Sequence, residues 1–567
     1  MNNKFVLKGY SIGLGLLLIV LFCSLIIKSP YIWEVSADNV TTSVTVGNSA
    51  PSFTAGPTES TESSSTNPTN VGTNVTWQAT GTDSNSEDYY LVVCSTDAVT
   101  ATEGDAPTCD VGTWCTSTAT TSGNQATCSR TALQGDSESN AWYAFVCDGN
   151  ASSASCSTSS QGSGATGSPF AVNHPPLFSD IGNNSGRDPG QTITWTATSS
   201  DTDSDGSQDT VKLLVCKTAG LTGSTCDGGG SDTWCTSSLV ASNPSCGYAI
   251  PAVYPDQNHD AYVYVFDSHN FAAASGTQGS NSSYTVNNVT PVVSGVNINS
   301  GSAIDLTEGS TTNIDIVGTV SDSNSCAGGE LETVYGYAYR SGIEYSGCDT
   351  SGESNTNYCY PEISCTVDGG TCTGDTDASA SFTCTVSLQY YADPTDVLTE
   401  FPTENWLSTF KVIDDDSASD SLEVSTGVEV NSLTALDVTG SISYGGLAVG
   451  QSNDPLDQIT TVTPTGNVGL DEELSGSNMC TDYPTCSAGV ITVGYQKTAL
   501  QSSTSYASGS VLTDSPVEYE LNLAKAESGS PSTANTWWGV LIPPGTVPGA
   551  YSGANIVGAV KGEIVDW

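Results

Sequence analysis

Apolar and polar residues alternate along this chain in short stretches about ten residues apart. Val75-Thr76-Trp77-Gln78-Ala79-Thr80 and Val517-Glu518-Tyr519-Glu520-Leu521-Asn522-Leu523 are two of them. Successive side chains of a strand point to opposite faces of a sheet, so this period of two predicts half-buried strands. Glycine, proline, asparagine and aspartate separate the stretches, and no helical pattern is convincing. The chain is therefore predicted to be all-β and built of sandwich domains.

Two segments repeat each other at a spacing of roughly 120 residues. The match includes tryptophans and cysteines as well as strands, so it indicates two copies of one domain. The matching segments are Val75–Thr80 with Ile193–Thr198, Leu91–Cys94 with Leu213–Cys216, Thr113–Thr116 with Thr233–Thr236, and Cys128 with Cys246. A third domain shares this skeleton more loosely, and a fourth region differs from it.

These patterns divide the chain into five parts. We expect an export segment at 1–37, sandwich repeats at 38–172 and 173–288, a third sandwich at 289–432, and a C-terminal sandwich at 433–567. The Ser/Thr/Pro-rich residues 54–72 are either a loop of the first domain or a flexible stalk.

The N-terminal segment carries a targeting pattern. Lys4 and Lys8 precede an uncharged run over residues 9–27, and Val35-Ser36-Ala37 offers a small-x-small cleavage site. A cleaved signal peptide fits the cleavage site, whereas an uncleaved membrane anchor fits the length of the run. Under either alternative the rest of the chain is exported, as an extracellular or cell-surface protein.

The cysteines agree with export. Of 19 cysteines, Cys23 lies in the apolar run and the rest divide by region into even groups. Domains that each close their own disulfides give that result. Zinc is the alternative, but the histidines lie far from paired Cys-x-x-Cys spacings. The groups are Cys94, Cys109, Cys115, Cys128, Cys147 and Cys156; Cys216, Cys226, Cys235 and Cys246; Cys326, Cys348, Cys359, Cys365, Cys372 and Cys384; and Cys480 and Cys486.

The repeat suggests partners for some of them. Cys147 corresponds to Phe266 in the second copy and Cys156 has no counterpart there, so these two are expected to pair with each other. Four cysteines allow three connectivities, and pairing between neighbours is the one expected for the shared four. Those pairs are Cys94–Cys109, Cys115–Cys128, Cys216–Cys226 and Cys235–Cys246, and Cys480–Cys486 closes a small loop. The connectivity within 326–384 stays open.

The chain is very acidic, with 61 Asp and Glu against 12 Lys and Arg. Such a charge repels nucleic acid and anionic membranes, so neither is expected as a partner except for a membrane contact through 9–27. Most carboxylates have no basic residue to pair with. Solvent or bound cations must therefore neutralise them.

Two proline-rich starts carry a family resemblance. They are Asn48-Ser49-Ala50-Pro51 and Asn173-His174-Pro175-Pro176, each followed by an acidic loop after the second strand and by a later strand that ends in aspartate. With these motifs the chain resembles the cadherin-like and PKD-type Ig-like modules of bacterial surface proteins. The resemblance implies tandem Ig-like β-sandwiches, a structural or adhesive role, and calcium at the domain junctions.

The clearest candidate for a calcium loop is Asp201-Thr202-Asp203-Ser204-Asp205-Gly206-Ser207-Gln208-Asp209. Calcium takes six to eight hard oxygen ligands, and acidic side chains at alternate positions can supply several. An EF-hand is excluded, because Lys212 occupies the position of its bidentate glutamate and strands flank the loop. A calcium site within a β-sandwich remains.

In an Ig-like sandwich the loop after the second strand and the loop before the last strand lie at the same end. Asp203, Asp205 and Asp209 are therefore expected to approach Asp267 at the junction with the preceding domain. The alternative is that acidic turns are simply common in so acidic a chain. The corresponding candidates are Asp83, Glu87, Asp88 and Asp148 in the first domain, and Asp322, Asn324, Glu330, Asp414, Asp415 and Asp416 in the third.

Other candidate sites have weaker patterns. Trp114, Trp234, Trp537 and Trp538 could stack on sugar rings, but strand aromatics more often form the core. His174, His259 and His269 accompany no serine or cysteine nucleophile motif. Asp414–Asp416 could supply a carboxylate pair for glycoside hydrolysis, but three adjacent acids in a turn are usually solvated. We therefore expect no enzyme.

The favoured function is an extracellular structural or adhesive rod with surface proteins or glycans as partners. The alternatives are a self-assembling surface-layer or fibre subunit and a secreted hydrolase with accessory binding modules.

Overall fold

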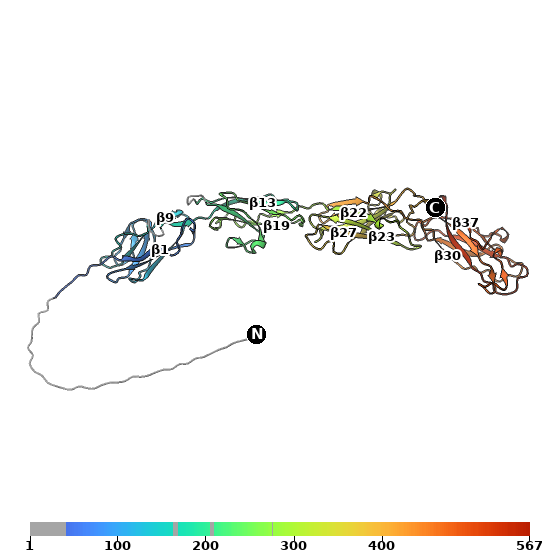
Figure 1. The fold of residues 1–567 in the computed structure, drawn as a ribbon, viewed down its shortest axis with the longest axis horizontal. Helices are drawn as coiled ribbons and strands as arrows, with labels where there is room; N and C mark the ends of the chain where they lie inside the picture. Colours follow the sequence, from blue (N-terminus) through green and yellow to red (C-terminus); the bar gives the residue numbers. More distant parts are fainter. Residues whose placement is uncertain (1–40, 163–167, 204–208, 275) are drawn as a thin grey trace, which may run out of the picture.

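The chain folds into four groups of β-strands that follow one another along one long axis (Figure 1). The structure is a computed structural model and describes residues 41–162, 168–203, 209–274 and 276–567. Strands carry nearly all the regular structure of these residues, and their helices are short 3-10 turns. The expected all-β fold is confirmed. The export segment, including residues 9–27, lies outside the described residues, and no described helix is long and apolar enough to cross a membrane.

The first two domains have the same arrangement of two small antiparallel sheets. The first domain consists of β1 (Ser52–Glu59), β3 (Asn74–Thr82) and β8 (Gln125–Thr131) against β10 (Tyr143–Asp148), β4 (Tyr89–Cys94) and β7 (Thr113–Thr116), with the short strands β2 (Thr69–Asn70), β5 (Val99–Thr100), β6 (Thr108–Cys109), β9 (Ser139–Asn140) and β11 (Phe170–Asn173).

In the second domain the order is repeated. Its strands are β12 (Leu177–Asn183), β13 (Thr192–Ser200) and β18 (Ser245–Ala249) against β17 (Thr233–Thr236), β14 (Val211–Cys216) and β20 (Tyr262–Asp267), with β15 (Leu221–Thr222), β16 (Thr225–Cys226), β19 (Asn258–His259) and β21 (Tyr284–Thr285) as short pairs. The repeat seen in the sequence is thus a repeat of the fold.

The third domain has two four-stranded sheets. They are β22 (Val292–Ile298), β23 (Thr312–Ser321), β27 (Ser379–Leu388) and β26 (Thr366–Val367), facing β25 (Cys359–Ser364), β24 (Leu331–Arg340), β28 (Trp406–Asp414) and β29 (Ser419–Glu423).

The fourth domain has sheets of unequal size. One consists of β30 (Leu436–Thr439), β31 (Gln458–Pro464), β38 (Ala534–Val540), β35 (Gln496–Ala499) and β36 (Ser510–Val511), and the other of β37 (Val517–Leu523), β32 (Leu470–Gly476) and β39 (Asn555–Lys561); β33 (Met479–Cys480) and β34 (Val490–Ile491) pair beside them.

The alternating pattern of the sequence sets which residues are buried between the sheets. In β3, Val75, Trp77 and Ala79 face the core, and the residues between them are exposed or half-buried. Each domain has its own core, and a fully buried tryptophan lies in each: Trp77, Trp195, Trp406 and Trp538. Burial of such large side chains is the main favourable term for domains of this size.

Nine disulfides join cysteines of the described residues, each within one domain. The five pairs that the repeat suggests are the pairs that the structure joins, and Cys480–Cys486 closes its small loop. In the third domain the pairs are Cys326–Cys372, Cys348–Cys359 and Cys365–Cys384. In the chain-entropy model each loop of about 15 residues adds about 3 kcal/mol. Disulfides in this number indicate an oxidising compartment, so the chain is an exported protein.

Candidate metal sites at the domain junctions

A buried aspartate occupies the same position in each of the first three domains. Asp148 is the last residue of β10 and pairs with the first residue of β4, Tyr89. Asp267 in β20 and Asp414 in β28 pair in the same way with Val211 and Leu331. All three are at most 1% exposed. We call Asp148, Asp267 and Asp414 the junction aspartates, because each lies where its domain begins.

The linker residue before each domain binds its junction aspartate. The side-chain amides of Asn48, Asn173 and Asn288 donate to Oδ2 of Asp148, Asp267 and Asp414 over 2.9, 2.8 and 3.0 Å. Asn173 and Asn288 connect two domains, so these hydrogen bonds fix the path of the chain at the junctions.

A second carboxylate in each domain comes from the loop after the second long strand. Asp83, Asp201 and Asp322 accept a hydrogen bond from the backbone N–H two residues further on. The residue that donates there, Asn85, Asp203 or Asn324, accepts in turn from a linker N–H. The same turn therefore holds both the linker and an acidic side chain next to the junction aspartate.

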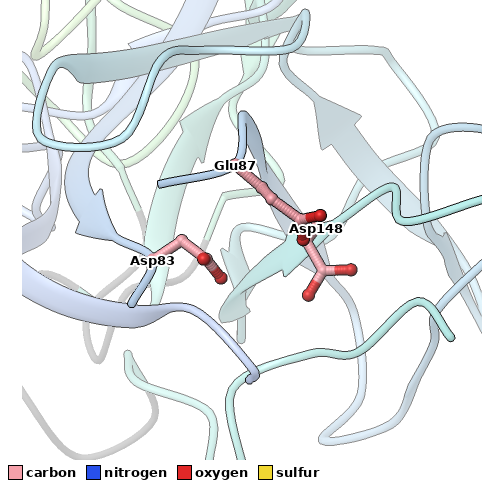
Figure 2. Close-up of side chains that lie close together, drawn as sticks. All are labelled: Asp83, Glu87 and Asp148. Carbon is pink, nitrogen blue, oxygen red and sulfur yellow. The ribbon is translucent and has the colours of Figure 1, made fainter. Parts of the chain in front are cut away.

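In the first domain three carboxylates converge. Figure 2 shows Asp83, Glu87 and Asp148 turned toward a common space, and one oxygen of each lies within 4.8 Å of the others. Asp83 is 6% exposed. Among the described residues, Oδ2 of Asp83 and Oε2 of Glu87 have no hydrogen-bond partner. Buried unpaired carboxylate oxygens are costly, and a divalent cation would satisfy both. Of the four candidates in this domain, Asp88 is not part of the group.

The second domain brings Asp201, Asp209 and Asp267 within the same distance of one another. Burial and the charges of Asp203, Asp267 and Asp209 raise the pKa of Asp201 to about 6. Burial also raises the pKa of Asp267. Carboxylates close together in a dry site favour a bound proton or a cation over three free charges.

Another residue of the proposed loop, Asp203, has a different role. Asp203 lies apart from this group, because its two oxygens bind the backbone N–H and the ring Nδ1 of His174 at 2.6 and 2.8 Å. Its role is to hold the linker, and no sequence motif around His174 indicates this contact. Asp205 lies outside the described residues. Asp209 also contacts His269 Nδ1 over 3.0 Å.

At the junction of the second and third domains, a cluster combines residues of both. Asp256 of the second domain lies with Glu330 and Asp415 of the third, with one oxygen of each inside 4.8 Å. Burial and the neighbouring charges of Asp256 and Asp415 raise the pKa of Glu330 to about 8. Sequence reasoning missed Asp256, which lies in a loop with no acidic repeat. We call Asp256, Glu330 and Asp415 the bridging cluster.

The remaining candidates of the third domain surround this cluster. Asp322 is 3% exposed, and its Oδ2 has no hydrogen-bond partner among the described residues. Burial, with the charges of Asp414, Asp256 and Asp415, raises the pKa of Asp322 to about 6. Asp416 interacts with Asp256 across the junction. Of the acidic run, only Asp414 is buried, whereas Asp415 and Asp416 are exposed in the turn that follows β28.

A fourth carboxylate group, Asp471, Glu520 and Glu563, lies in the last domain. Both glutamates are exposed. The sequence motifs did not point to it.

The junction of the third and fourth domains is built with basic residues instead. Lys561 ends β39 and pairs with Leu470, which is the position of the junction aspartates in the other domains. Its Nζ donates to Ser432 of the linker over 3.0 Å. Lys525 is buried and contacts Asp393 and Glu527, both at 3.1 Å, while Arg340 Nε contacts Asp393 at 3.0 Å.

Most of the aromatic and histidine candidates are buried or lie against other side chains. Trp234 and Trp538 are buried in the cores, Trp114 packs against Phe170 and Arg130, and Trp537 lies in β38. His174 is buried at the first junction, and His259 stacks on Tyr284.

No model of a known protein family matches the sequence, and no curated protein is similar to it. Solved structures offer remote likenesses. A marsupial T cell receptor has 8% identity and a TM-score of 0.27, with 65% of this chain and 99% of that chain covered. The ectodomain of mouse nectin-like molecule 4 has 6% identity and a TM-score of 0.27, with coverage of 64% and 96%. The Yersinia pseudotuberculosis adhesin InvE has 16% identity and a TM-score of 0.16, with coverage of 40% and 58%.

Proposed function

We propose that this protein is an extracellular structural or adhesive rod whose first three domains are stiffened by calcium at their junctions. The observation that carries the proposal is the threefold repetition of one arrangement. A buried junction aspartate, a second acidic side chain from the neighbouring loop and a linker asparagine meet at the start of each domain.

The donor set suits calcium. All the converging atoms are hard oxygens, and calcium accepts carboxylate, amide and backbone oxygens in flexible geometry. Asp83, Glu87 and Asp148 would hold one ion in the first domain, and Asp201, Asp209 and Asp267 one in the second. The bridging cluster would hold a third between the second and third domains.

A cation in the bridging cluster would do more than stabilise a loop. Its ligands Asp256 and Glu330 belong to different domains, so binding would couple the orientation of one domain to the next. Without the ion the same carboxylates repel one another and favour separation. A rod that is stiff in calcium and more flexible without it suits a protein that spaces or presents surface contacts, with other surface proteins or glycans as the partners we propose.

The proposal is tested on the purified protein by small-angle X-ray scattering and calorimetry with millimolar calcium and then with chelator. We expect a longer, stiffer particle and higher melting temperatures in calcium, both reversed by chelator, and a smaller effect of magnesium because it demands a tighter octahedral shell. The variant Asp267→Asn should lose the response of its domain, whereas Glu429→Gln, at an exposed position, should keep it. Scattering and melting curves indifferent to calcium would refute the proposal.

A further inference from the structure

In the fourth domain, β39 has no strand paired to one of its edges among the described residues, whereas its counterparts β10, β20 and β28 are bonded on both edges. In the first and second domains the segment after β10 or β20 turns back and bonds along it, with bridges such as Ala144 to Gln161 and Tyr262 to Asn281. In the third domain β29 pairs with β28. Among the described residues β39 pairs only with β32, so its other edge is open.

Burial shows the consequence. Five of the six residues of β10 are buried and so are five of six in β20, whereas no residue of β39 is fully buried. Val557 and Ala559 pack against the core from partly exposed positions, and Ile556 is 64% exposed. The sandwich of the fourth domain is thus incomplete along this edge. An open edge with apolar side chains is a template for an added strand.

At the other end of the molecule lies a strand-like segment with no partner. Residues 41–46 read Thr-Thr-Ser-Val-Thr-Val, a run of β-branched residues and serine without a charge. Such residues favour strands. Yet the segment belongs to no strand and is unpaired among the described residues, and Val44 and Val46 are 87% and 77% exposed. Its lack of charge lets it approach a second copy of a chain whose net charge is −49.

The geometry excludes pairing of these two elements within one molecule. The first and fourth domains lie at opposite ends of the row, with two domains between them (Figure 1). A second copy must therefore supply the segment.

Strand direction then decides how two copies would be arranged. Lys561 contacts the linker to the third domain, so β39 runs from the free end of the fourth domain (Asn555) toward that junction. A strand antiparallel to β39 would end at the free end. The domain that follows this added strand in its own chain would then continue the rod in line.

We propose that residues 41–46 of one molecule pair antiparallel with the open edge of β39 in a second molecule, so that copies join head to tail into a fibre. A second observation agrees with this. The first domain carries the full junction arrangement, with Asn48 bound to Asp148, although no domain precedes it among the described residues. In the fibre the fourth domain of the neighbouring copy lies at that place.

The test uses the full-length protein and measures mass against concentration by light scattering and electron microscopy. Wild-type protein grows into rods of several copies, whereas the double variant Val44→Asp, Val46→Asp stays single. This variant changes only exposed residues outside the folded domains, so its folding is not at risk. Added to wild type it shortens the fibres, because it accepts a strand and cannot donate one.

Crosslinking locates the contact. Val44→Cys combined with Ile556→Cys, Val557→Cys or Gly558→Cys in the same chain gives a ladder of covalent oligomers on a non-reducing gel, and the single variants give none. Wild-type protein that stays single at every concentration, a double variant that assembles normally, or a crosslink from Val557→Cys to a different protein would each overturn the proposal. The melting response to calcium is independent of all three outcomes, so the two proposals fail separately.

Discussion

The second and fourth domains bind the incoming linker at the same position of the sheet, but with side chains of opposite charge. Each must fix the chain that enters it from the preceding domain. In the second domain Asp267 accepts a hydrogen bond from the linker residue Asn173. In the fourth domain Lys561, at the equivalent position of the sheet, donates one to the linker residue Ser432.

The change from an acidic to a basic side chain decides whether the junction requires cations from the solvent. Asp201 and Asp209 place two further carboxylates beside Asp267, and His269 is the basic residue whose charge acts on it. At the last junction Arg340, Lys525 and Lys561 gather, although the chain has only 12 lysines and arginines in all. A junction that contains its own cations is complete by itself, and a junction of carboxylates depends on ions in the solvent. The predictions below test that difference.

Removing a built-in cation should have the largest effect. The Lys525 ammonium is buried between Asp393 and Glu527, so Lys525→Ala leaves carboxylate charge uncompensated at the last junction. We expect a loss of about 3–5 kcal/mol in the stability of the third and fourth domains. Calorimetry measures it, with Lys497→Ala in the same domain as a control that should cost less than about 1 kcal/mol. Equal losses in the two variants would contradict the special role of Lys525.

Calcium should act mainly on the carboxylate junctions. At a hundredfold excess over its dissociation constant, an ion that binds only the folded state adds about 2.7 kcal/mol, or on the order of 5–10 °C for domains of this size. The melting transitions of the first three domains are expected to rise by this amount, and that of the fourth to rise less. A uniform shift of all four transitions would show that calcium does not distinguish the two kinds of junction.

Exchanging the lysine of the last junction and an aspartate of an earlier junction should exchange how the two domains respond to calcium. Lys561→Asp places an aspartate beside Ser432 and removes the ammonium, which we expect to cost about 2 kcal/mol in chelator. Calcium should recover part of the loss. Asp414→Lys should have the converse effect and make the third domain less responsive to calcium. Calorimetry of both variants with and without calcium tests whether this side chain sets the calcium response. An intact calcium response in Asp414→Lys would contradict that role.

The carboxylate junctions should also depend on pH. Burial raises the pKa of Asp201 and of Asp322 to about 6, above the value near 4 of an unfolded chain. The folded protein then holds protons that the unfolded chain releases between pH 4 and 6, so stability falls as pH rises through this range and stays low above it. In chelator we expect a loss of roughly 1–2 kcal/mol per site from pH 4 to 7. Saturating calcium should remove most of it, because the cation replaces the proton.

The smallest expected effect is that of a linker asparagine. Asn288→Ala removes one hydrogen bond to Asp414 and should cost about 1 kcal/mol. Ser294→Ala, an exposed position on β22, is the control. Calorimetry of the third domain with and without calcium separates this loss from loss of the ion, since the calcium response should persist in Asn288→Ala.

Much of the fold could be predicted from local pattern. The alternation of Val75, Trp77 and Ala79 predicts a strand with one buried face, and β3 has that face. The site was only partly predictable. Asp83 and Asp148 lie together as expected from the ends of their strands, but the choice of Glu87 over Asp88 depended on which side chain of the loop turns inward.

The sequence alone determined what depends on neighbours along the chain. Strand periodicity, the duplication of a domain and the pairing of nearby cysteines all follow from spacing, because a strand has a fixed period and a short loop holds its two cysteines close. Tertiary structure decided what depends on distant residues meeting. Asp256 joins Glu330 across a junction, Asp203 turns to His174, Lys561 replaces an aspartate, and β39 keeps an open edge. Each follows from the packing of one domain or sheet against another, and no local pattern specifies that packing.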